Sequence, residues 1–239
     1  MAVNIGQPSL CSFLAYMYRA GIEFDGKKIL ECGAGGSIPP LSLFYERGFE
    51  TYGIDIDDKQ IERAATFERE NGMSLNIIKA DMQEIPFDDG FFDVVYECQA
   101  MCHLTKKDIR QTIAEMHRVL KVDGLCYMTF MSRDHWPLGG KEIADGEFQS
   151  HYEGVDYVHS FFFDDEPEGL LTDFEILRKA KQSILYAREW AEMSEDDWMD
   201  WYSDDWTGFT RDRWRALYPE RTKNRRMEFL EYIVKKGGR

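Results

Sequence analysis

The sequence has no run that approaches the roughly 18 apolar residues needed to span a bilayer. Its opening stretch, MAVNIGQPSLCSFLAYMYRAG, has no basic leader before the short apolar segment, which disfavours a secretory signal. Cysteine is scarce and odd in number: the five residues are scattered, so we interpret them as reduced thiols and expect no disulfide framework. These absences predict a cytoplasmic protein without a membrane span.

Basic surface is scarce as well. The 239-residue chain carries a formal net charge of -15, and residues 145–205 contain 18 acidic and 4 basic residues. The only basic cluster is RTKNRR at 221–226, which we interpret as a solvated surface patch. A nucleic-acid binder needs cationic side chains that neutralise phosphates, so DNA or RNA is not the expected partner.

What the sequence does contain is an alternation of strand-like and helix-like segments over its first 131 residues. Strands are expected at KKILEC, ETYGIDI, SLNIIKA, FFDVVYEC and GLCYMTFM. Helices are expected over 39–47, from Asp58 to a stop at Gly72, and along the apolar face of Ile109, Ile113, Met116 and Leu120. Repeated β-α-β units imply an α/β fold with a doubly wound, mostly parallel sheet.

The rest of the chain is less regular. A loop, a short helix and a strand around 174–177 are expected, and RRMEFLEYIVKKGG predicts a final strand. Between these strands, five of the six tryptophans lie among many acids, a segment we interpret as a helical insertion or cover. Its aromatic faces and carboxylates could instead select a cationic acceptor. We expect a single domain over 1–239, with a cofactor-binding core at 25–135 and a variable region at 136–225.

A glycine-rich turn, KKILECGAGGS at 27–37, follows the first expected strand. In parallel α/β sheets the crevice beyond the carboxyl ends of the strands binds ligands, so this turn is in a suitable place. Dinucleotide folds use G-x-G-x-x-G, but here Gly33 and Gly35 are followed by Ile38 where the third glycine belongs. The spacing therefore disfavours a dinucleotide.

The motif ECGAGGS resembles the first motif of the class I S-adenosylmethionine-dependent methyltransferases, acid-x-Gly-x-Gly-x-Gly, with Ser37 in place of the last glycine. Three further stretches, YGIDIDD, KADMQEIPFDDGFFDVV and VVYECQAMCHL, follow in the family's order. The resemblance is to small-molecule members, in the group similar to the ubiquinone and menaquinone biosynthesis enzymes. It implies a Rossmann-like sheet of seven strands with an antiparallel last strand.

The resemblance also implies a binding site for S-adenosylmethionine, with S-adenosylhomocysteine as the product. Asp55 would accept the ribose hydroxyls, Ile56 would pack on adenine, and Asp81 would meet the adenine amino group. The full set of implied cofactor-binding residues is Glu31, Gly33, Ala34, Gly35, Asp55, Ile56, Asp81, Met82, Glu97 and Cys98.

His103, just beyond the fourth expected strand, is the candidate catalytic base, because an imidazole titrates near neutral pH. It could equally cap or pack against the helix that follows. Cys98 and Cys102 could bind a soft acceptor such as arsenic, although buried, inert thiols are the commoner case. No spacing of His, Cys or carboxylate residues predicts a metal site.

The predicted function is transfer of a methyl group from S-adenosylmethionine, by in-line displacement, to a small-molecule acceptor. Two alternatives remain: a non-catalytic protein that binds S-adenosylmethionine or S-adenosylhomocysteine, and an NAD-dependent oxidoreductase. The sequence identifies neither the acceptor nor the oligomeric state.

Overall fold

The structure is a computed structural model that describes residues 8–134, 141–152, 155–185, 194, 196 and 226–238. Its helices and 3-10 turns are α1 (Pro8–Arg19), α2 (Ser42–Tyr45), α3 (Asp58–Asn71), η1 (Met101–His103), α4 (Lys106–Val119) and η2 (Glu166–Leu170). Its strands are β1 (Lys28–Cys32), β2 (Glu50–Asp55), β3 (Ile77–Lys79), β4 (Phe92–Glu97), β5 (Leu120–Ser132), β6 (Lys141–Ala144), β7 (Glu147–Tyr152), β8 (Val155–Phe162), β9 (Phe174–Leu185) and β10 (Arg226–Lys236).

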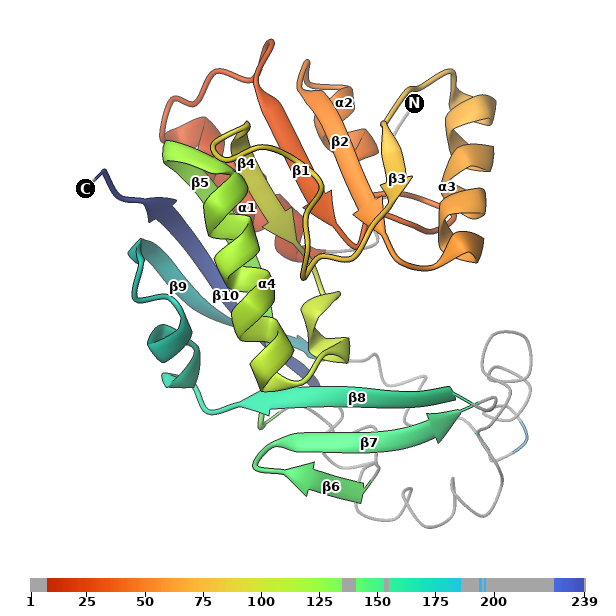
Figure 1. The fold of residues 1–239 in the computed structure, drawn as a ribbon, viewed down its shortest axis with the longest axis vertical. Helices are drawn as coiled ribbons and strands as arrows, with labels where there is room; N and C mark the ends of the chain where they lie inside the picture. The colour runs from red at the N-terminus through yellow and green to blue at the C-terminus, as the bar shows by residue number, and fades with distance from the viewer. Residues whose placement is uncertain are drawn as a thin grey trace.

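The main sheet has the strand order β3-β2-β1-β4-β5-β10-β9 (Figure 1). Strands β1 to β5 are parallel to one another, and β10 is antiparallel to both β5 and β9. The sheet reverses its order beside β1, and ligands bind outside such switch points in open α/β sheets. The predicted doubly wound sheet of seven strands, with an antiparallel last strand, is confirmed.

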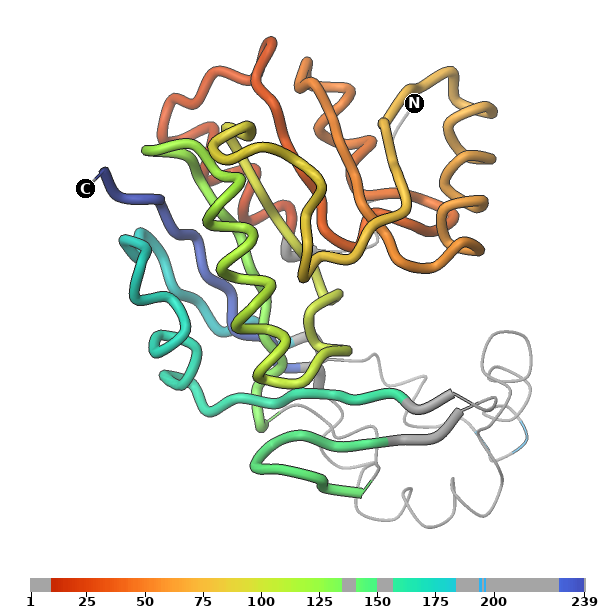
Figure 2. The backbone as a smooth tube through the Cα atoms, viewed as in Figure 1, coloured from red at the N-terminus to blue at the C-terminus, as the bar shows by residue number. Residues whose placement is uncertain are grey.

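Three further strands were not predicted. Strands β6, β7 and β8 form an antiparallel meander, and β8 joins the end of β5 through the pairs Met131↔Phe161 and Ser132↔Phe162. Figure 2 shows this meander beyond the end of the main sheet, next to η1. The stretch from His159 to Phe162 is part of β8, because β5 and β7 supply its partners. The Trp-rich segment interpreted as a helical cover lies outside the described residues, apart from two isolated positions.

Two apolar layers hold the sheet between its helices. On one face, Ile109, Ile113 and Met116 of α4 pack against β4, β5 and β10, as the predicted apolar stripe requires. On the other face, Phe13 of α1 stacks on Tyr127 of β5, with ring centroids 4.9 Å apart. Both layers consist mainly of buried residues, and such close-packed layers make the sheet a rigid support for the loops at its ends.

Local sequence signals explain most helix boundaries. Asp57 caps α3 by accepting from the Lys59 amide, and Gly72 ends it with a left-handed φ of 64°. Thr105 caps α4 in the same way, through the Asp108 amide. The helix expected over 39–47 is shorter, since α2 has only four residues and its entry is a series of turns.

Candidate cofactor and active site

The glycine turn follows β1 and is fastened to the end of β2. The amides of Gly33 and Ala34 both donate to the Ile54 carbonyl, at 2.8 and 2.9 Å. The Gly35 amide donates to Asp55 Oδ2 at 2.9 Å. Gly33 has a φ of 86°, a backbone conformation that glycine adopts far more readily than other residues. The glycine turn and the Asp55 carboxylate at the end of β2 are therefore held together by hydrogen bonds.

Gly33 also allows a close approach by another loop. A Cβ built on Gly33 would lie 2.5 Å from the Ala100 Cβ, which no pair of real side chains tolerates. Ala100 belongs to the loop that leaves β4, so the missing side chain lets this loop lie against the glycine turn. The exits of β1 and β4 are thus in direct contact.

A cavity of about 690 Å³ lies at the carboxyl ends of β1, β2 and β4. Its size is within the range of small-molecule and cofactor sites. Its walls are formed by Gly33, Gly35, Ile54, Asp55, Ile56, Gln60, Ala80, Asp81, Met82, Gln83, Cys98, Gln99, Ala100, His103, Leu104 and Tyr157. The position is the one expected for the ligand of a doubly wound sheet.

Eight of the predicted residues line this cavity: Gly33, Gly35, Asp55, Ile56, Asp81, Met82, Cys98 and His103. The structure therefore brings together residues from four loops, spread over 71 positions of the sequence. Their roles toward a cofactor stay predictions. Three predicted residues, Glu31, Ala34 and Glu97, are buried and do not line the cavity.

The two aspartates on the cavity are held by backbone amides. Asp55 is half-buried, and its Oδ1 and Oδ2 accept from the amides of Asp57 and Gly35, both at 2.9 Å. Asp81 Oδ1 accepts from the Gln83 amide at 2.8 Å. An ionised carboxylate has about four acceptor sites, so both side chains keep capacity for hydroxyl or amino groups of a ligand.

The sequence interpretation missed seven lining residues: Ile54, Gln60, Ala80, Gln83, Ala100, Leu104 and Tyr157. Gln60 is in the first turn of α3, and its position shortly after Asp55 is the signal that could have identified it. Tyr157 carries no local signal, because β8 reaches the cavity only through its pairing with β5 and β7.

Glu97 is fully buried and accepts four hydrogen bonds from Ala100, Met101 and Thr129. Its Oε2 accepts from the amides of Ala100 and Met101, both at 3.1 Å. Its Oε1 accepts from the Thr129 amide at 2.5 Å and hydroxyl at 3.0 Å. Burial raises the pKa of Glu97, while these four donors lower it. The structure thus places Glu97 under the loop after β4, not on the cavity wall where direct cofactor contact was expected.

Glu31 is buried in the middle of the sheet, between β2 and β4. Burial raises its pKa to about 8, against the lowering effect of the Tyr96 hydroxyl and the Leu41 backbone, and Asp55 and Glu97 raise it further. Its Oε2 has no partner among the described residues. The Glu31 side chain of the folded protein is therefore protonated at neutral pH.

We expect Glu31→Gln to flatten the pH dependence of stability. The folded protein holds a proton on Glu31 that the unfolded chain releases above pH 4.5, so the group destabilises the fold as pH rises from about 4.5 to about 8. The loss approaches about 1.4 kcal/mol per pH unit within that window. Urea unfolding at pH 5.5 and 7.5 measures it. An equal slope in wild type and Glu31→Gln would contradict the assignment.

His103 is at the end of η1 and lines the cavity. Its imidazole packs edge-on against His159 of β8, with ring centroids 4.9 Å apart. The Ser160 hydroxyl of the same strand donates to the Leu104 carbonyl at 2.6 Å, which holds β8 against η1. Desolvation lowers the pKa of His103, so its imidazole is neutral at pH 7 and able to accept a proton.

The cysteines near the site are thiols packed in apolar surroundings. Cys98 and Cys102 are buried, and the Cys102 Sγ donates to the Gln99 carbonyl at 3.1 Å. Burial raises the pKa of Cys102, which disfavours the thiolate that binds soft metals. The described residues contain no cluster of three His, Cys, Asp or Glu side chains that could hold a metal ion.

Residues 30–128 match the family model described as "Methyltransferase domain". This part of the chain is therefore similar to methyltransferase domains. It contains the glycine turn, both aspartates and the loop after β4, and the predicted class I resemblance is confirmed. The S-adenosylmethionine cofactor implied by the resemblance has the same support.

Curated relatives are similar to part of the chain. The "Sterol 24-C-methyltransferase" of Pneumocystis carinii is 34% identical over 141 residues, which is 57% of this chain and 35% of the relative. The chain therefore spans about a third of that relative's length.

Among the residues that the structure describes, no helix is long and apolar enough to cross a membrane.

Solved structures extend the likeness of the methyltransferase domain to nearly the whole chain. A SAM-dependent methyltransferase from Methanosarcina mazei has a TM-score of 0.66 at 19% identity, covering 93% of this chain and 98% of that one. The [4+2]-cyclase SpnF has a TM-score of 0.64 at 18% identity, covering 95% and 80%. At these identities the likeness shows the fold, and the cyclase shows that one fold accommodates different reactions.

Proposed function

We propose that this protein is a cytoplasmic methyltransferase that uses S-adenosylmethionine on a small-molecule acceptor. The observation that carries the proposal is that Asp55, Asp81 and the glycine turn line the same cavity. All of them lie in the part of the chain that matches the methyltransferase family model. Two carboxylates at the ends of adjacent strands suit the ribose hydroxyls and the adenine amino group of one nucleoside. The family relationship supports the same cofactor.

The described residues fit this cofactor. Ile56 is 65% exposed and, with Met82, gives the cavity apolar surface beside the two aspartates. Such surface suits the faces of an adenine ring. The cofactor supplies a methyl group activated on a sulfonium. Asp55 and Asp81 would hold the nucleoside, and the turn from Gly33 to Gly35 would lie against the methionine part.

The protein's own contribution to transfer is alignment and removal of water. The acceptor must approach the methyl group from the side opposite sulfur, and holding it there replaces a bimolecular encounter with an oriented one. His103 and Tyr157 line the cavity from η1 and β8, two elements outside the nucleoside-binding loops. We place the acceptor on this side. His103 would take a proton from a hydroxyl or amine acceptor as the new bond forms.

Binding of S-adenosylhomocysteine tests the cofactor assignment. We expect this ligand to raise the melting temperature of the protein and NAD to leave it unchanged, because only a ligand that binds the folded state stabilises it. The reverse result would favour the oxidoreductase alternative. Incubation of labelled S-adenosylmethionine with sterols, hydroxylated aromatics and amines then searches for the acceptor. Binding without transfer to any of them would favour the non-catalytic alternative.

We expect His103→Ala to separate catalysis from cofactor binding. Loss of a general base lowers turnover by about 10²–10⁴-fold, whereas S-adenosylhomocysteine affinity should change little. The wild-type rate should fall only below pH 6.5, because desolvation lowers the pKa of His103 from that value and the neutral form persists above it. Initial rates across pH, with the acceptor found in the screen, measure both. Undiminished turnover in His103→Ala would remove the base from the mechanism.

A further inference from the structure

The loop after β4 has an unusual backbone at a position that faces the cavity. Gln99 has a φ of 61°, in the left-handed region that residues with a side chain adopt infrequently. Such a conformation persists where the surrounding structure fixes it, and it tends to be found at functional sites. The contacts around Gln99 show which groups fix it here.

Thr129 of β5 makes the decisive contact with this residue. Its Oγ1 accepts from the Gln99 amide at 2.8 Å and donates to Glu97 Oε1 at 3.0 Å. Thr129 is 2% exposed and Glu97 fully buried, so these bonds do not compete with water. The Thr129 hydroxyl therefore connects Glu97, at the start of the loop, to Gln99, the residue with the left-handed backbone.

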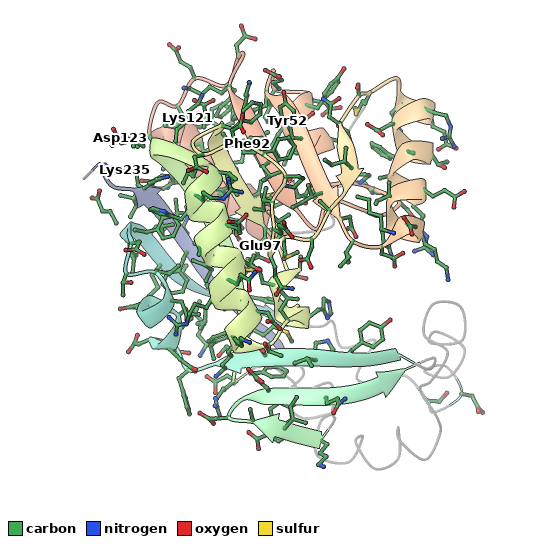
Figure 3. The ribbon with its side chains drawn as sticks, viewed as in Figure 1. Tyr52, Phe92, Glu97, Lys121, Asp123 and Lys235 are labelled. Carbon is green, nitrogen blue, oxygen red and sulfur yellow. The ribbon has the colours of Figure 1, made fainter. Side chains whose placement is uncertain are left out.

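Glu97 extends the same network along the loop. Its second oxygen accepts from the amides of Ala100 and Met101, the two residues that follow Gln99. All four groups that contact the carboxylate are donors, which is the pattern expected of an ionised acceptor. Figure 3 shows Glu97 at the end of β4 close to η1, far from Phe92 at the start of the strand.

The loop so fixed forms one wall of the proposed cofactor site. Gln99, Ala100 and His103 all line the cavity. The Ala100 Cβ also occupies the space that a side chain on Gly33 would need, so displacement of the loop changes the glycine turn as well. Thr129 itself does not line the cavity and can act on a ligand only through these residues.

We propose that Thr129 is a positioning residue of the cofactor site: its hydroxyl, bonded to Glu97 and Gln99, holds the loop after β4 in the conformation that binds S-adenosylmethionine. This inference rests on the proposed function, because it assumes that the cavity takes this cofactor. The competing interpretation is that Thr129 only fills space in the core.

The test is calorimetric measurement of S-adenosylhomocysteine affinity in Thr129→Val and Thr129→Ser. Valine keeps the shape and loses the hydroxyl, whereas serine keeps the hydroxyl and loses a methyl group. We expect at least about tenfold weaker binding for valine and a change within about threefold for serine, since the hydrogen bonds depend on the hydroxyl alone. Thr129→Ala gives the same comparison if the valine variant does not fold.

Thr112→Val is the matched control. Thr112 is equally buried in α4, and its hydroxyl has no partner among the described residues, so affinity should not change. Wild-type affinity in a folded Thr129→Val or Thr129→Ala variant, or equal losses in the valine and serine variants, would overturn the inference. If the wild-type protein fails to bind S-adenosylhomocysteine, the proposed function itself fails, and this inference with it.

Discussion

Replacing Asp55 with alanine is expected to weaken S-adenosylhomocysteine binding by about 100-fold or more. The Asp55 carboxylate already accepts two backbone amides, one from Gly35 and one from Asp57. Of its roughly four acceptor sites two remain, which matches the two hydroxyls of a ribose. Hydrogen bonds to an ionised acceptor contribute about 1.5–3 kcal/mol each, so loss of both accounts for the predicted factor.

Asparagine at position 55 makes the same test more specific. Its side-chain NH₂ group would have to face one of the two backbone amides, both of which are donors. We therefore expect Asp55→Asn to lose much of the affinity in spite of its nearly identical shape. Isothermal titration of each variant with S-adenosylhomocysteine gives the dissociation constants.

Asp57→Ala is the control for this prediction. Asp57 is exposed and two residues away, and its side chain caps α3 through the Lys59 amide. Its loss should lower the free energy of unfolding by about 1 kcal/mol and leave ligand affinity nearly unchanged. Comparable affinity losses at positions 55 and 57 would show that the effect comes from the start of α3 and would exclude ribose recognition by Asp55.

The second large effect is expected for Gly33→Ala. The new Cβ would lie 2.5 Å from the Ala100 Cβ, in a backbone with a φ of 86°. A left-handed alanine costs about 1–2 kcal/mol, and an overpacked contact typically adds about 1–3 kcal/mol. We therefore expect the free energy of unfolding to fall by about 3 kcal/mol and ligand binding to weaken, because the loop after β4 must move.

Two further variants separate the backbone cost from the clash. Gly72 has a similar φ of 64° and nothing within 4 Å of its would-be Cβ, so Gly72→Ala should cost only about 1 kcal/mol. Ala100→Gly removes the clashing methyl group, and it should recover part of the loss when combined with Gly33→Ala. Denaturant unfolding of the four variants measures the coupling. Strictly additive losses would contradict the contact between the two loops.

Local patterns in the sequence were sufficient to predict most of the fold between residues 25 and 135. The helix caps at Asp57 and Gly72 and the apolar stripe of α4 depend on residues within a few positions of one another. The glycine turn and the aspartates after β2 and β3 could be located because strand ends of a parallel sheet meet at one edge. Gly33, Gly35, Asp55 and Asp81 accordingly line one cavity.

The sequence was least informative where contacts join distant segments. The meander β6–β8 was not predicted. Only two residue pairs join it to β5, and this pairing produces no recognisable alternation of apolar and polar residues in the sequence. The expectation that Glu97 faces the cofactor followed from its place at the end of β4. Its actual partner Thr129 is 32 residues away, and nothing local indicates that the pair exists.

The sequence by itself thus determined a doubly wound methyltransferase fold and the approximate location of the proposed nucleoside site. Both depend on local periodicity and on the short motifs that end parallel strands. Only the tertiary structure decided which residues face the cavity and which support it. Burial and hydrogen bonding across strands made Glu31 and Glu97 internal groups, and the meander brought Tyr157 and His159 to the side of His103. Whether a side chain is buried or lines the cavity depends on packing between segments that are far apart in the chain.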